Sequence, residues 1–434
     1  MRKAIATVLM AIVSAVSFAQ SGTNSPYSQY GLGVLSDQTS APYKGMNGLA
    51  LGFHDHNQIN YLNPASYASL DSLTFIFDIG ASGQLTNYQE GNKKINAKNA
   101  NFEYAIAGFR LVRNLGLSFG VIPFTNTGYS YSTTERIGDS PNGLSSTSYT
   151  NTYTGSGGLH QAYIGLGWSP FKGLAVGVNA SYLWGSYQRS IVNAYTDNYV
   201  STVSKYYYAD VSSYKLDFGV QYTAKLSKKD EVTLGITYGL GHKLGADPRC
   251  VVAAVNKQTG VRDSTEFIAH NAIETPSTYG VGFAWNHNNK WRFGADYSLQ
   301  KWSSVKYPVY TTSGDDAQYK AVSNMFADRH KVTLGGEYCA NERSRRFLKR
   351  VRYRIGASYT TPYLKINGQD GPKEYSVSAG FGIPIINSYN NRSILNISAQ
   401  WVRQDSKTFI TENSFRINIG LTFNERWFAK WKLE

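Results

Sequence analysis

The sequence predicts an all-β protein, a transmembrane antiparallel β-barrel of about 14 strands with an N-terminal plug, or hatch, in its lumen. Two observations support this prediction: apolar and polar residues alternate, and long and short connections alternate. The clearest segment is 414–423, whose apolar residues are Phe415, Ile417, Ile419, Leu421 and Phe423. A period of two places these side chains on one face of a strand. About ten such residues suffice to cross an outer membrane in a tilted strand.

The same alternation recurs along residues 71–424, which we expect to form the barrel. The expected strands are 73–84, 102–113, 115–135, 147–169, 173–191, 204–225, 230–247, 264–287, 290–303, 328–341, 349–362, 372–385, 393–404 and 412–424.

The connections predict which end of the barrel faces outward. Short turns at 113–114, 170–172, 227–229 and 287–289 separate longer polar segments near 85–101, 136–146, 192–203, 248–263 and 304–327. Outer-membrane barrels have tight turns on the periplasmic side and longer loops outside. A soluble β-sandwich gives no reason for such an alternation in length.

The first 19 residues have the pattern of a signal peptide. Arg2 and Lys3 precede a short apolar run at 4–16, and Ser17-Phe18-Ala19 supplies small residues for cleavage before Gln20. The run is too short to span a membrane as a helix, and the alternative reading is a buried N-terminal helix. We therefore expect export to the bacterial outer membrane, with residues 425–434 as a periplasmic tail.

The composition and charge of the chain indicate which kinds of partner it can bind. The chain carries 43 Lys and Arg against 29 Asp and Glu, yet it shows no nucleic-acid-binding module, so we expect no nucleic-acid partner. A basic cluster in one turn is suited to lipid phosphates or periplasmic anions; it contains Arg343, Arg345, Arg346, Lys349 and Arg350. Outer-membrane lipid and lipopolysaccharide are expected partners of the barrel. We expect a monomer that meets the barrel-assembly machinery during biogenesis.

Residues 20–70 do not read as strand, because Gly, Pro, aromatic and amide residues are spread through them. A barrel of about 14 strands is too wide to be filled by its own side chains, so we expect this segment to be the hatch. Charged residues on polar strand faces are expected to form a network in the lumen, because lipid exposure would cost each a few kcal/mol. They are Arg292, Asp296, Lys331, Glu337, Arg352, Arg354 and Arg416.

Catalytic, cofactor and metal sites have little support in the sequence. It has no Gly-x-Ser-x-Gly elbow, phosphate loop or zinc signature, so we expect no enzyme and no cofactor. His54-Asp55-His56 allows a metal site, but a solvated or hydrogen-bonded pair of imidazoles is favoured. Cys250 and Cys339 are expected at opposite ends of the barrel, which favours two separate thiols over a disulfide.

Several short motifs, in the same order along the chain, resemble the FadL/TodX-like family of outer-membrane channels for hydrophobic compounds. Asn63-Pro64-Ala65 is similar to the family's hatch motif, and the strand 117–124 is interrupted by Pro123 as in the family's third strand. The segments 275–285, 291–303 and 353–362 are similar to later family strands. The opening at 25–33 differs from that of the well-studied fatty-acid channels and resembles a branch from Bacteroidetes-type bacteria.

The resemblance implies passive uptake of hydrophobic small molecules, long-chain fatty acids or aromatic compounds, past the hatch. It also implies sideways exit through a gap at a kink, for which Pro123 is the candidate because proline lacks a ladder N–H. Pro123 can equally mark the end of strand pairing near the outer rim. The competing functions are a non-transporting barrel that docks or shuttles a partner in protein secretion, and a barrel enzyme or open porin.

Overall fold

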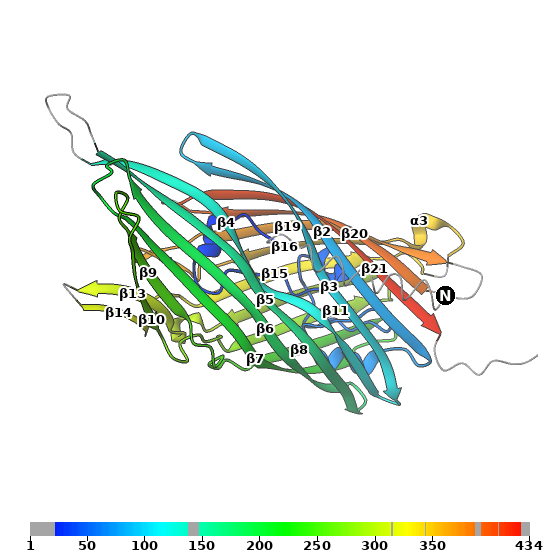
Figure 1. The fold of residues 1–434 in the computed structure, drawn as a ribbon. Helices are drawn as coiled ribbons and strands as arrows, with labels where there is room; N and C mark the ends of the chain where they lie inside the picture. Colours follow the sequence, from blue (N-terminus) through cyan, green and yellow to red (C-terminus); the bar gives the residue numbers. More distant parts are fainter. Residues whose placement is uncertain are drawn as a thin grey trace, which may run out of the picture.

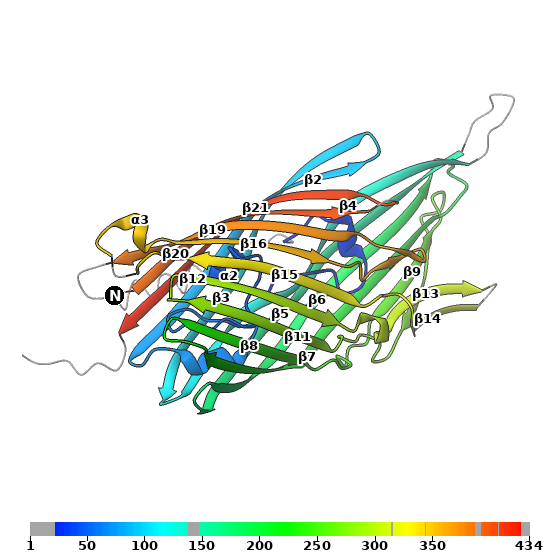
Figure 2. The ribbon, with the colours of Figure 1, turned by 180° about the vertical axis from the view of Figure 1, so that it is seen from behind.

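The computed structural model describes residues 22–137, 147–313, 316–342, 344–386, 392–406 and 408–426. The expected signal peptide, Arg343 of the basic cluster and residues 427–434 of the expected tail lie outside this part of the chain. Fourteen antiparallel strands form a tilted barrel, and the hatch segment runs through its interior (Figures 1 and 2).

The wall closes because the first barrel strand pairs with the last from Thr74–Arg426 to Gln89–Thr411. The wall strands are β2 Thr74–Glu90, β3 Lys93–Val112, β4 Leu115–Ile137, β5 Thr147–Phe171, β6 Leu174–Tyr195, β7 Thr202–Lys225, β8 Asp230–Gly239, β11 Thr278–His287, β12 Trp291–Gln300, β15 Arg329–Tyr338, β16 Arg352–Thr360, β19 Lys373–Ile386, β20 Arg392–Asp405 and β21 Thr411–Arg426. The predicted fold class and the predicted number of strands are confirmed.

Three of the expected boundaries were wrong. The expected strand 230–247 ends at Gly239, as β8. The expected outer loop at 85–101 is a tight hairpin, because β2 continues to Glu90 and β3 begins at Lys93. The expected strand 264–287 is two elements: β10 Arg262–Ile268 pairs with β9 Arg249–Val255 in an outer hairpin, and β11 belongs to the wall. Pro276 lies between them and cannot donate a ladder hydrogen bond.

The remaining elements are short. Two further hairpins lie in the outer loops, β13 Tyr307–Ser313 with β14 Asp316–Val322 and β17 Lys365–Ile366 with β18 Gln369–Asp370. The helical turns are η1 Pro26–Gln29, α2 Ala41–Lys44, η2 Pro64–Ser69, η3 Trp302–Ser304 and α3 Phe347–Arg350, and the hatch contains the two-residue strand β1 Val34–Leu35. In the described part of the chain, no helix has the length and apolarity needed to cross a membrane.

Alternation along β21 separates a lipid-facing side from a lumen-facing side. Phe415, Ile417 and Ile419 are 46, 45 and 51 % exposed, whereas Ser414 and Asn418 on the other face of the strand are buried. Near the short turns, aromatic rings cluster on the exposed side, with the centroids of Trp291 and Tyr338 4.2 Å apart. Such rings are enriched where a transmembrane barrel meets the interface.

The hatch is held against the inner wall by apolar contacts and by close backbone approach. Ile59, Tyr67 and Leu70 are fully or almost fully buried and pack on wall residues such as Ile106 and Tyr163. Three glycines in register, Gly167, Gly177 and Gly219, lie beneath the start of η2. A Cβ on Gly177 would lie 2.4 Å from the carbonyl carbon of Pro64.

This contact predicts the effect of adding one methyl group. Gly177→Ala should displace η2 and lower the stability of the folded barrel by about 1–3 kcal/mol, because the contacting atoms are backbone and cannot rotate away. The measurement is the temperature at which the purified barrel loses its folded migration on a gel. Gly83→Ala is the matched control, since a Cβ there meets nothing within 4 Å. Equal transition temperatures for the two variants would contradict the close contact between Gly177 and η2.

Candidate functional site: the lumen and the β3–β4 seam

The hatch motif forms the start of η2. The Asn63 side chain caps this turn by accepting a hydrogen bond from the Ala65 N–H at 3.2 Å, and its amide donates to the Leu51 carbonyl at 2.9 Å. Pro64 occupies the first helical position, where a missing N–H costs nothing. The motif therefore shapes the hatch, and its side chains are buried against the wall.

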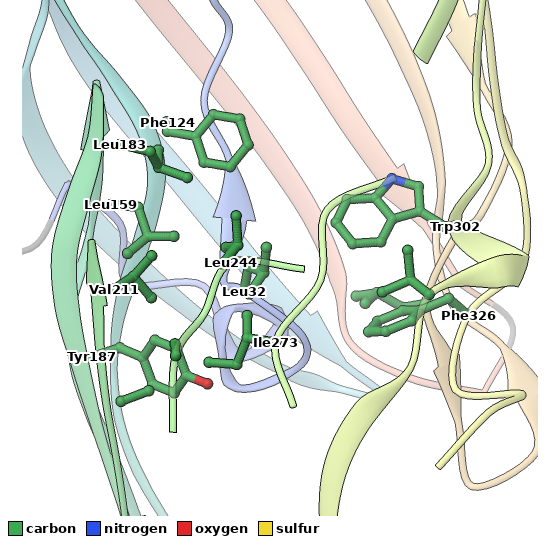
Figure 3. Packing of buried hydrophobic residues seen from close by; sticks show 14 of the residues in the cluster. Leu32, Phe124, Leu159, Leu183, Tyr187, Val211, Leu244, Ile273, Trp302 and Phe326 are labelled. Carbon is green, nitrogen blue, oxygen red and sulfur yellow. The ribbon is translucent and has the colours of Figure 1, made fainter. Parts of the chain in front are cut away.

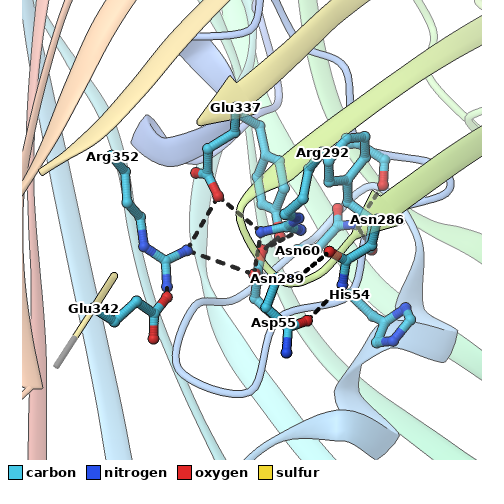
Figure 4. Close-up of polar contacts among 12 residues, drawn as sticks. His54, Asp55, Asn60, Asn286, Asn289, Arg292, Glu337, Glu342 and Arg352 are labelled. Atoms are coloured by element: carbon cyan, nitrogen blue, oxygen red, sulfur yellow. Dashed lines mark hydrogen bonds and ion pairs between the residues drawn. The ribbon is translucent and has the colours of Figure 1, made fainter. Parts of the chain in front are cut away.

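A buried ion-pair cluster joins the hatch to the wall near the short turns (Figure 4). Arg292 of β12 contacts Asp55 of the hatch at 2.7 Å and Glu337 of β15 at 3.0 Å. From β16, the Arg354 Nε donates to Glu337 at 2.6 Å, and Arg352 approaches the same carboxylate at 3.4 Å. The predicted lumen residues Arg292, Glu337, Arg352 and Arg354 thus lie together, with Asp55 as the partner from the hatch.

The other predicted lumen residues lie apart from this cluster. Asp296 accepts hydrogen bonds from the hatch N–H groups of Ala50 at 2.7 Å and Leu51 at 2.9 Å. Arg416 donates to Gln84 at 2.8 Å, and Lys331 lines the central cavity. A role for these seven residues as a lumen network stays a prediction. Alternation shows which side of the wall a residue faces but not how high it sits in the lumen.

A second link between hatch and wall has no signal in the sequence. Lys44 of α2 is 1 % exposed and donates to Glu103 of β3 at 2.6 Å, while Asp37 lies 3.9 Å away. Glu103 also accepts a hydrogen bond from Ser82 of β2. These partners are far apart in the chain, so only the folded hatch brings them together.

Charge on the hatch follows from these contacts. Burial alone would raise the pKa of Asp55, but Arg292 and Arg352 hold it below the ordinary value of 3.8. The Asp55 carboxylate also accepts a hydrogen bond from Tyr43 at 2.9 Å. The two imidazoles beside Asp55 have different partners: His56 contacts Asp71 at 2.8 Å, which raises the His56 pKa, and His54 lies 3.7 Å from Glu231. The two imidazoles therefore do not point to one common position where a metal ion could bind.

The wall is interrupted between β3 and β4, and we call this interruption the seam. The β3–β4 ladder ends at Ala105–Val121. Beyond it, the ladder pairs of β3 residues 93–104 among the described residues are with β2 alone, and β4 residues 122–137 pair with β5. The two strands diverge toward the outer rim (Figure 1). Two hatch residues pair with the free edge of β4, Val34 with Asn126 and Leu35 with Thr125.

Pro123 lies at the base of the seam. The register of β4 against β5 shifts between Pro123 and Thr125, which marks a local irregularity. A cavity of about 340 Å³ borders this point and is lined on one side by Asn101, Phe102 and Glu103 of β3, and on the other by Pro123, Phe124 and Asn126 of β4. The cavity continues past Leu35 into the lumen.

The two ends of the lumen differ. At the outer end, an apolar cluster fills the space between wall, hatch and loops (Figure 3); it includes Leu32, Phe124, Leu159, Leu183, Trp302 and Phe326. At the end with the short turns, a polar cavity of about 810 Å³ lies beside Asp55, Arg292 and Glu231. Cys250 and Cys339 are both buried and unpaired.

This plugged transmembrane barrel has the fold of the channels for hydrophobic compounds. The Pseudomonas putida toluene transporter TodX is similar at a TM-score of 0.61 and 15 % identity, with 91 % of this chain and 100 % of that chain covered. The Ralstonia pickettii toluene transporter TbuX gives 0.59 and 14 %, with 90 and 99 % covered. A Pseudomonas aeruginosa FadL homologue gives 0.59 and 13 %, with 91 and 99 % covered.

The chain belongs to the BamG family, whose model matches residues 1–434. No curated protein sequence matches it. The resemblance to FadL-like channels found in the motifs is confirmed at the level of the fold. The role of each motif residue stays a prediction.

The ion-pair cluster predicts that Asp55 anchors the hatch. Asp55→Asn should loosen residues 40–70 by about 3–5 kcal/mol, because it removes the hatch carboxylate that pairs with the buried guanidinium groups of the wall and leaves Glu337 as their shared partner. Protease protection of the hatch is the measurement, with barrel folding followed separately. Asp405→Asn is the control, since its pair with Arg403 is about 45 % exposed at the arginine and is worth at most about 1 kcal/mol. Unchanged hatch protection in Asp55→Asn would contradict the anchoring role.

The lowered pKa of Asp55 also predicts a pH dependence. A depressed carboxyl pKa contributes stability above its unfolded value, and this contribution is lost as the pH falls through the folded value. Hatch protection should therefore persist from pH 7 to about 4 and decline below that range. In Asp55→Asn this acid-dependent decline should be smaller than in the wild-type barrel. An identical decline in both proteins would show that other groups control it.

Proposed function

We propose that this protein is an outer-membrane channel for the passive uptake of hydrophobic small molecules, which leave the lumen sideways through the seam. The observation that carries the proposal is the position of the central cavity, which borders both unpaired strand edges at the base of the seam. A molecule in this cavity is separated from the outside of the wall by β1, by hatch residues 22–25 and by the side chains at the edges of β3 and β4. Asn24 donates a hydrogen bond to Asn99 of β3 at 3.1 Å, so this part of the hatch lies along the β3 edge.

The lining supports an amphipathic ligand. Leu35, Phe102 and Phe124 offer apolar contacts beside the seam. Lys331 and Arg416 line the same cavity together with carboxylates such as Asp37, Glu374 and Glu412, so its polar lining carries both signs of charge. A long-chain fatty acid has both kinds of surface, and an aromatic compound needs only the first. A volume of about 340 Å³ lies in the usual range for small-molecule sites.

Sideways exit is the physically economical route for such a ligand. An apolar molecule that enters the bilayer directly avoids crossing a water-filled path, and its transfer from water is favourable. The step requires β1 to leave β4, and β1 holds that edge through only two paired residues. Pro123 supports the opening, because it has no N–H to donate to a neighbouring strand. We propose Pro123 and β1 as the parts of the lateral gate.

The likeness to the toluene transporters and the FadL homologue supports a transporting barrel over an enzyme. Asn63, Pro64 and Ala65 would keep the hatch in the shape that leaves the cavity open beside the seam. Lipopolysaccharide and phospholipid would surround the wall, and a single chain is sufficient for the proposed route.

A second candidate is a barrel that docks or shuttles a partner in protein secretion without transport. The packed apolar cluster at the outer end favours it, because this cluster separates the cavity from the outer loops. The name of the family, BamG, also points toward the barrel-assembly machinery as a partner. The two candidates make opposite predictions for uptake.

A reversible crosslink between β1 and β4 tests the transport route. Leu35→Cys combined with Thr125→Cys places two thiols at directly paired positions, in a background where Cys250 and Cys339 are replaced by Ser. Oxidation should reduce uptake of a labelled long-chain fatty acid or of toluene to the level of a deletion strain, since β1 can no longer leave the edge. Reduction should restore it.

The matched control places the same crosslink in an uninterrupted part of the wall. Ala399→Cys with Ile417→Cys joins paired residues of β20 and β21, and its oxidation should leave uptake unchanged. Unaltered uptake in the oxidised β1–β4 variant would contradict lateral exit. Equal uptake of both ligands by deletion and wild-type strains would contradict transport itself and favour the docking role.

A further inference from the structure

The upper part of the seam lies beyond the proposed ligand route and has a different chemistry. Along β4, residues 129–136 pair with β5 on one side and, among the described residues, form no ladder on the side that faces β3. Eight residues of extended strand span about 27 Å. A free edge of this length presents unpaired N–H and C=O groups that can accept another strand.

The side chains show that this edge lies outside the hydrocarbon. The outward-facing apolar residues of β4 end at Val121, and farther along the strand the exposed residues Ser130, Ser132 and Thr134 share one face. On β3, Lys94, Asn96 and Lys98 are exposed and alternate in the same way. The upper seam is therefore in contact with water or with polar headgroups.

The hatch already demonstrates strand addition at this edge. Below residue 129, β1 pairs with β4 in antiparallel register, and the N–H of Ser36 donates to the Phe124 carbonyl at 3.0 Å. The next contact above is made by a side chain, as the Ser28 hydroxyl donates to the Gly128 carbonyl at 3.2 Å. Farther up, the Tyr131 hydroxyl donates to the Gln29 side chain at 2.9 Å. Among the described residues, no main chain of the hatch pairs with the edge of β4 above residue 128.

The two strands at the seam are not equivalent. Lysines are typical guards of an exposed strand edge, and β3 carries Lys93, Lys94 and Lys98 along its unpaired part. The unpaired part of β4 carries Tyr129, Tyr131 and hydroxyl residues, with charge only at Glu135 and Arg136 near its end. The edge of β4 thus lacks the protection that β3 has.

We propose that the upper seam is a strand-addition site that binds an extended segment of another polypeptide against the edge of β4. The segment alternates apolar and acidic residues. Its apolar side chains face inward toward Tyr131 and Ile95, which is 69 % exposed. Its acidic side chains face outward toward Lys94 and Lys98. Main-chain hydrogen bonds supply affinity in this mode of recognition, and alternate side chains supply specificity.

A second copy of the chain fits this site less well. Joining two β3 edges would bring lysines together, and the free edge of β4 has no acidic stretch to offer to the β3 lysines of a partner. The charge of the seam thus favours a foreign acidic strand.

The test uses the full-length barrel in detergent and a fluorescein-labelled nine-residue peptide that alternates valine with aspartate. Binding is followed by fluorescence anisotropy at low salt, and saturable binding is expected. A peptide of the same sequence, N-methylated at every second residue on the edge that pairs with β4, should bind at least about tenfold more weakly, because it keeps the side chains but loses the main-chain donors.

Charge-reversal variants test the lysines on the β3 side of the proposed site. Lys94→Glu with Lys98→Glu should weaken binding at least about tenfold through repulsion of the aspartates. Lys172→Glu with Lys228→Glu is the matched control, because these exposed lysines lie in turns at the opposite end of the barrel. The control should bind the peptide as the wild-type barrel does.

Proline variants test the edge itself. Successive residues of a strand direct their N–H groups to opposite neighbouring strands. Of the two variants Ser132→Pro and Thr133→Pro, one therefore removes an N–H that faces the free edge, and the other removes an N–H that faces β5. The free-edge variant should keep the folded gel migration of the wild type and lose peptide binding. The other variant should disturb the β4–β5 ladder and lose the folded gel migration. Gel migration therefore shows which of the two prolines lies on the free edge.

Several results would overturn the proposal. They are no saturable binding, equal binding of the N-methylated and unmodified peptides, equal binding by the folded proline variant, and self-association of the barrel that the lysine reversals abolish. Binding of lipopolysaccharide to Lys94 and Lys98 without any binding of peptide would also overturn it. Ligand uptake through the base of the seam is a separate property, so its presence or absence does not bear on these outcomes.

Discussion

Strands in a bilayer have to satisfy their main-chain hydrogen bonds within the protein, because hydrocarbon offers no partner. This constraint accounts for the continuity of the wall and for the position of the seam. The ladder continues around the wall, and its longest interruption among the described residues is the seam between β3 and β4. The interruption begins at Ala105–Val121, where the outward apolar residues of β4 end. The exposed edges therefore lie where water or headgroups can reach them.

The hatch compensates for the interruption from within. Its strand β1 covers the lowest part of the β4 edge, and Lys44 pairs with Glu103 on the opposite side of the seam. Farther down, Asp55 is enclosed by guanidinium groups from two wall strands. The hatch is thus fixed by buried ion pairs near the short turns, whereas β1 and its neighbours are held at the seam by hydrogen bonds between uncharged groups. Opening β1 leaves the buried ion pairs intact, so movement at the seam costs less than movement of the whole hatch.

The sequence was sufficient to predict the strands whose two faces differ in polarity. β12, β16 and β21 have clean alternation, and their expected limits differ from the structure by a few residues. It failed at 85–101, because Lys, Asn and Gln on the outer part of a hairpin resemble the residues of a loop. It also joined β10 to β11, since alternation alone does not show where a strand leaves the wall.

The candidate site was less predictable for a physical reason. Polar-face charges such as Arg292 and Arg354 were recognisable as lumen residues, but their partner Asp55 comes from a hatch without regular periodicity. The seam left almost no trace in the sequence. Pro123 marks its base, yet the loss of pairing between β3 and β4 depends on the direction in which each long strand diverges.

Amide hydrogen exchange of the barrel in lipid nanodiscs tests the central claim most directly. The account predicts that about half of the amides in β3 residues 93–104 and β4 residues 129–136 exchange rapidly, since alternate N–H groups face the seam. Amides of β20 residues 395–404, which pair on both sides, should be protected in the same sample. Protection of the β3 and β4 segments equal to that of β20 would show that the wall is closed there and would contradict the account.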